Sequence, residues 1–108
     1  MGKTINFTID GENYTLEFTR KTVIATERMG FSYNRIDDQP VGMAEILWKG
    51  AFLAHHDTLT IAEVEALYEK IDKHGLLDAL VELYRAPIES LFEEDKGNSK
   101  NVVKWTIN

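Results

Sequence analysis

Histidine, serine and carboxylate side chains are the groups in this sequence that could carry catalytic or metal-binding chemistry. His55 and His56 are adjacent, so on a helix their side chains point about 100° apart, whereas a helical metal-binding pair has a spacing of three or four residues. His74 precedes Gly75, which we expect to end a helix, where a cation interacts favourably with the helix dipole. We therefore expect a capping role for His74 and no metal or cofactor at any histidine.

The serines and carboxylates have no spacing typical of an active site. Ser32, Ser90 and Ser99 lack the sequence context of a nucleophile elbow, and no group of glycines has the spacing of a phosphate-binding loop. The clustered carboxylates fit solvated helix faces better than acid–base pairs, because a useful shift in pKa needs burial or a specific partner: Glu63, Glu65, Glu69, Glu93, Glu94 and Asp95. The sequence thus predicts that the protein is not an enzyme.

Composition limits the classes of partner and the location. The 108 residues include no cysteine, which excludes disulfides and thiolate–zinc sites. The net charge is −6, and residues 36–95 carry fourteen acidic and four basic side chains. Nucleic-acid binding needs clustered Lys and Arg, so we do not expect it. No apolar run reaches the roughly 20 residues that cross a bilayer, and the N-terminus lacks the apolar core of a secretion signal, so we expect no membrane contact and a cytoplasmic location.

Residues 40–57 form the element around which the predicted fold is arranged. Pro40 suits a first helical position, and apolar residues then cover most of the circumference of a helix. The main stripe contains Ala44, Leu47, Trp48, Ala51 and His55, and its flanks contain Met43, Ile46, Phe52 and Leu53. A helix with so little polar surface must be covered on several sides, so we predict a central core helix.

A β-hairpin is predicted at residues 4–19. Apolar residues alternate with polar ones on both sides of the turn-forming Asp10-Gly11-Glu12-Asn13. We expect three facing pairs, which place every apolar side chain on one face: Ile9 with Tyr14, Phe7 with Leu16, and Ile5 with Phe18. Because a lone hairpin is marginally stable in water, that face should pack on helices.

Helical spacing predicts further helices around this core. One covers residues 20–29, with Gly30 just past its end, and an ordered loop at 31–39 follows, held by Phe31 or Tyr33. Thr60 and Glu63 have the spacing of a capping box at the start of the helix that Gly75 ends. Residues 77–92 continue at helical intervals, but Pro87 should cause either a kink or two helices that meet near Ala86.

The predicted fold is therefore α+β and mainly helical, with an N-terminal antiparallel hairpin packed on a bundle of four or five helices. Residues 1–95 form one hairpin-plus-helical domain, and residues 96–108 form a basic tail with three lysines. The tail contains VVKWTI, which has strand propensity. It either adds a short strand to the hairpin or stays mobile until a partner binds.

The combination of hairpin, helical body and tail resembles the small tail assembly chaperones of long-tailed phages and prophages of Gram-positive bacteria. The resemblance covers most of residues 4–95 and rests on INFTIDGENYTLEFTRKTVIATERMGF, on a helix containing ILWKGAFLAHH, and on an acidic helical end. It implies a non-enzymatic protein that binds and shields the tape measure protein during tail assembly and helps recruit subunits of the tail tube protein.

Large aromatic residues are the candidates for contact with such a partner: Trp48, Phe52, Tyr84, Phe92 and Trp105. They would shield apolar stripes of a helical tape measure protein in a helix-in-groove mode. The alternative is that they are core, because helical spacing usually indicates burial. Two other functions stay open: a small structural component of the tail or head-completion machinery, and a regulatory adaptor of the host. The sequence also leaves open whether copies of the chain associate.

Overall fold

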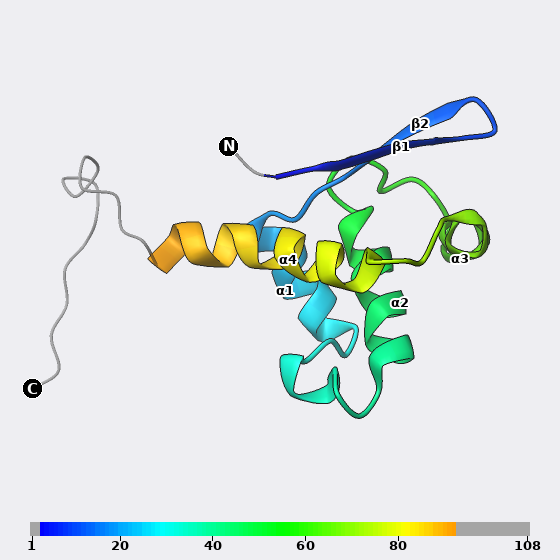
Figure 1. Ribbon diagram of the computed structural model, residues 1–108. Helices are drawn as coiled ribbons and strands as arrows, with labels where there is room; N and C mark the ends of the chain where they lie inside the picture. The colour runs from blue at the N-terminus through cyan, green and yellow to red at the C-terminus, as the bar shows by residue number, and fades with distance from the viewer. Residues whose placement is uncertain (1–2, 93–108) are drawn as a thin grey trace, which may run out of the picture.

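The computed structural model describes residues 3–92, and within them an N-terminal hairpin precedes four α-helices (Figure 1). The fold is α+β and mainly helical, which confirms the predicted class. The elements follow in the order β1 Ile5–Ile9, β2 Glu12–Leu16, α1 Arg20–Arg28, η1 Tyr33–Arg35, α2 Pro40–Ala51, α3 Ile61–Lys70 and α4 Leu76–Phe92, where η1 is a single 3-10 turn. The predicted strand propensity at VVKWTI lies outside the described residues.

The hairpin has the predicted apolar face but a different register. Phe7 pairs with Tyr14 and Ile5 with Leu16, so the predicted pairs are wrong by two residues. The reason is the turn: Asp10 and Gly11 both have positive φ, at 52° and 83°, as a two-residue type I′ turn requires. A shift of two residues keeps every side chain on its original face.

Helix α2 is the central helix of the fold, as predicted, and it contacts α1, α3 and α4 (Figure 1). It is shorter than predicted, because it ends at Ala51 and not at residue 57. The carbonyl of Ala51 accepts a hydrogen bond from the backbone N–H of Glu17 at 3.1 Å. In a longer helix this carbonyl would accept from residue 55, so the contact with Glu17, one residue past β2, replaces the hydrogen bond that would continue the helix.

One apolar core joins the hairpin to the helices. The Phe7 ring lies 5.7 Å from the Trp48 ring, so the apolar face of the hairpin packs on α2. Phe18, beyond the end of β2, packs edge-on against Tyr84 of α4 at 5.4 Å. Helices α1 and α2 approach closely at Gly50, where an added methyl group would overlap Thr26.

Helix α1 and the loop after it agree with the sequence prediction. Thr19 and Thr22 form a capping box at the start of α1, and Gly30, with φ of 110°, follows its end. Phe31 is buried and its ring lies 4.7 Å from that of Tyr84, whereas Tyr33 is exposed. Phe31 is therefore the aromatic residue that holds the loop on the core.

Two predictions for the later helices need correction. The capping box of Thr60 and Glu63 is present, but α3 ends at Lys70 where Ile71 adopts an extended conformation, so Gly75 does not end it. Gly75, with φ of 72°, instead lies directly before α4. Helix α4 continues through Pro87, so the expectation of two helices meeting near Ala86 is wrong; proline removes only one helical hydrogen bond, and α4 also packs on α2. Among residues 3–92, no helix is long and apolar enough to cross a membrane.

Candidate functional site

The adjacent histidines fasten strand β2 to the segment that follows α2. His55 Nε2 lies 2.7 Å from Glu17 Oε1, and His56 Nε2 accepts a hydrogen bond from the backbone N–H of Thr15 at 3.0 Å. Both histidines lie in the segment after α2, which ends at Ala51, and not in the helix, contrary to the prediction. These contacts tie Thr15 of β2 and Glu17, one residue past the strand, to the segment after α2, which gives the histidines a structural role in this fold.

His74 does not cap a helix C-terminus. It is exposed in the turn before α4, and its backbone N–H donates to Asp72 Oδ1 at 3.0 Å. The predicted capping role is wrong because α3 already ends at Lys70. Within residues 3–92, no group of three or more His, Cys, Asp or Glu side chains is placed to hold a metal ion.

Three of the aromatic residues predicted to contact a partner belong to the core. Trp48, Phe52 and Tyr84 are 1%, 1% and 2% exposed. The indole N–H of Trp48 donates to the carbonyl of Val64 at 2.8 Å, and the Tyr84 hydroxyl donates to Glu27 at 2.8 Å. Burial and this hydrogen bond raise the pKa of Tyr84, which keeps it a donor. These three residues are therefore core residues, which was the alternative to contact with a partner. Trp105 and the Phe92 side chain lie outside the described part of the chain.

An apolar hollow of about 250 Å³ opens where the ends of α1 and α2 meet the start of α3. Its floor contains the buried side chains of Phe52 and Val64. At its rim, Met29 is 41% exposed and Ile61 is 67% exposed, which is high for large apolar side chains. The remaining lining residues are Ala25, Lys49, Leu53, His56 and Leu59. This hollow is an apolar surface that core formation has left uncovered.

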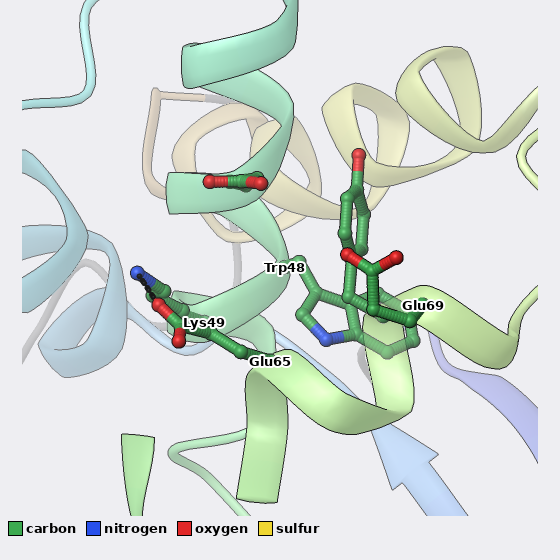
Figure 2. Close-up of a pocket in the computed structure, with 6 residues that line it drawn as sticks. Trp48, Lys49, Glu65 and Glu69 are labelled. Atoms are coloured by element: carbon green, nitrogen blue, oxygen red, sulfur yellow. Dashed lines mark ion pairs between the residues drawn. The ribbon is translucent and has the colours of Figure 1, made fainter. Parts of the chain in front are cut away.

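An acidic hollow of about 210 Å³ lies between α2 and α3 (Figure 2). Figure 2 shows the ion pair of Lys49 and Glu65, with an N–O distance of 3.0 Å, on one side of Trp48 and Glu69 on the other. The other lining residues are Glu45 and Tyr68. Burial, and then the carboxylates of Glu45 and Glu69, raise the pKa of Tyr68. Three carboxylates and one amine thus give this hollow a net negative charge.

The two hollows are neighbours on the surface formed by α2 and α3. Lys49 lines both, and the consecutive residues Val64 and Glu65 line one each. The ion pair between Lys49 and Glu65 therefore stands at the boundary between an apolar and an acidic region. Such a combination suits binding of another macromolecule through apolar contact and charge.

Comparison with known proteins places the chain in a family. The family model described as "Domain of unknown function (DUF5055)" matches residues 1–108. The chain belongs to this family. No curated protein and no solved structure matches the chain. The DUF5055 family match spans both hollows and every element of the fold.

The rim residues of the apolar hollow in this DUF5055 chain were missed by the sequence prediction. Ile61 is three residues before the buried Val64, so helical periodicity places it on the buried side of α3 and gave no sign that it is exposed. Met29 follows the last residue of α1 and precedes Gly30, and no periodicity marks such a position. The acidic hollow was missed because its carboxylates come from two helices whose contact depends on the fold.

Proposed function

We propose that the protein is a phage tail assembly chaperone that binds and shields the tape measure protein and helps recruit tail tube subunits. The observation that carries the proposal is the apolar hollow with its exposed rim residues Met29 and Ile61. A long helical protein with exposed apolar stripes needs such a surface if it is to stay unaggregated before assembly.

Two further features support this role. The resemblance to tail assembly chaperones covers most of residues 4–95 and includes the segment ILWKGAFLAHH, which contributes Lys49, Phe52, Leu53 and His56 to the apolar hollow. The second feature is the acidic hollow, which adds a charged contact next to the apolar one. The proposed activity is binding without catalysis, and it takes place in the cytoplasm of the host cell, where the partner is synthesised.

Co-expression with the tape measure protein tests the proposal. The candidate partner is the tape measure protein, and the measured quantity is the fraction of that protein in the supernatant after centrifugation. We expect the fraction to rise when the chain is present and the two proteins to co-purify. An unchanged fraction, with no co-purification, contradicts the proposal.

Purified mature particles separate this role from a structural one. A chaperone acts during assembly and should be absent from particles, whereas a small tail or head-completion protein should be present at a fixed ratio to the tail tube protein. Mass spectrometry of gradient-purified particles measures this ratio. Stoichiometric presence of the chain would favour the structural component instead.

A further inference from the structure

The apolar and acidic hollows have dimensions that fit side chains of a macromolecule better than a small molecule. Their volumes of about 250 and 210 Å³ are below the roughly 300 Å³ at which ligand pockets begin. Side chains that anchor a protein partner need only such shallow, separate recesses. The two hollows therefore suit successive anchors on one partner segment.

The chemistry of the two hollows specifies the anchors. The apolar hollow, with Leu53, Leu59 and Ile61 in its wall, takes an aliphatic or aromatic side chain. In the acidic hollow, three carboxylates face one amine, so a lysine or arginine is the complementary anchor.

We propose that the two hollows form one docking face for an amphipathic helix whose apolar stripe is bordered on one side by lysine or arginine. An α-helix presents such neighbouring anchors at spacings of three and four residues. The identification of this helix as a tape measure segment rests on the proposed function, whereas the preference for a basic border follows from the surface itself. The negative charge of the hollow rejects a helix with an acidic border.

Variants at the rim test the apolar part of the face. Ile61 and Val41 are the most exposed large apolar residues in the described chain, at 67% and 71%, and both stand in the first turn of a helix. Ile61→Glu places a charge at the apolar hollow, and Val41→Glu is the matched control outside it. Both variants should fold, because an exposed change at a helix start is tolerated and an acid there suits the dipole.

Charge reversal tests the acidic part. Glu69→Lys changes the acidic hollow, and Glu89→Lys makes the same change in net charge near the end of α4, which Figure 1 shows on the other side of the molecule from α3. The probes are two synthetic amphipathic helices of about 20 residues with the same leucine stripe, one bordered by lysine and one by glutamate. Fluorescence anisotropy with the full chain gives each dissociation constant.

We expect the lysine-bordered peptide to bind at least about tenfold more tightly than the glutamate-bordered one at low salt. Ile61→Glu should weaken binding of the lysine-bordered peptide roughly tenfold and Val41→Glu less than about twofold. Glu69→Lys should remove most of the preference for lysine, and Glu89→Lys should leave it. Equal affinity for both peptides, or equal effects of the paired variants, overturns the docking face.

The same variants separate this inference from the proposed function. If the tape measure protein co-purifies with Ile61→Glu as well as with the unmodified chain, the function stands and the face is wrong. If the lysine-bordered peptide binds as expected but the tape measure protein does not co-purify, the face stands and the function is wrong. If sedimentation shows a dimer of the free chain that Ile61→Glu dissociates, the face joins two copies of the chain and the proposal is overturned.

Discussion

Replacing Gly50 with alanine should destabilise the protein, although alanine is the better helix former. Gly50 is in the last turn of α2, where the helix meets α1. A Cβ atom added there would lie 2.9 Å from both Cβ and Cγ2 of Thr26, and closer still to Oγ1 of that residue. Thr26 is fully buried, and its hydroxyl donates to the carbonyl of Thr22 at 2.7 Å, so it has little freedom to move away.

The sign of the change depends on two opposing terms. Alanine in place of glycine within a helix stabilises by up to about 1 kcal/mol. Overpacking a close helix contact typically costs about 1–3 kcal/mol, and the upper part of that range applies because the backbone-linked Cβ of Thr26 is among the overlapping atoms. We therefore expect a net loss of about 1–2 kcal/mol in the free energy of unfolding.

Urea unfolding followed by far-UV circular dichroism measures this loss. Gly42→Ala is the matched control, because it is in the same helix and an added Cβ there meets no atom of the described chain within 4 Å apart from its chain neighbours and the backbone of its own helix; it should gain up to about 1 kcal/mol. Thr26→Ala removes two of the three overlapping atoms, so the double variant with Gly50→Ala should be more stable than the sum of the single effects by about 1 kcal/mol. A Gly50→Ala variant as stable as Gly42→Ala would refute the close contact of α1 and α2.

Three other predictions follow from the core and the surface. Trp48→Ala should cost roughly 3–5 kcal/mol by urea unfolding, and a loss under about 0.5 kcal/mol would show that Trp48 is not core. Because folding raises the pKa of Tyr84, this tyrosine loses its proton first in the unfolded chain as pH rises. Stability should therefore be constant below about pH 9 and fall above about pH 10. The midpoints of urea unfolding measured across that range should fall less in Tyr84→Phe than in the unmodified chain. Ile61→Glu should change stability by no more than about 0.5 kcal/mol, and a larger loss in thermal unfolding would mean that its side chain is packed.

Local patterns predicted the two strands and the four α-helices, but not the 3-10 turn η1, and tertiary contacts decided where the elements end. The alternation around Phe7 and Tyr14 gave the correct face of the hairpin, but the register depended on which residues take positive φ in the turn. Helical periodicity continued past Ala51, yet the helix ends there because the Ala51 carbonyl bonds to Glu17, far away in sequence. Such long-range hydrogen bonds leave no periodic signal.

The candidate site was harder to predict for the same reason. Large aromatic residues such as Trp48 and Phe52 were the predicted candidates for contact with a partner. Large apolar side chains are also those that a core most often buries, and both residues are buried here. The exposed apolar positions Met29 and Ile61 stand at helix ends, where neither periodicity nor capping indicates exposure. Contact between α2 and α3 is what brings Glu45, Glu65 and Glu69 together.

Direct binding of the tape measure protein is the measurement that tests the central claim. The full chain, Ile61→Glu and Val41→Glu are each mixed with a purified, soluble fragment of the tape measure protein, and light scattering after size exclusion gives the mass of the complex. We predict a stable complex with the unmodified chain and with Val41→Glu, and its loss with Ile61→Glu. The absence of any complex with the unmodified chain would contradict the proposed role as a tail assembly chaperone.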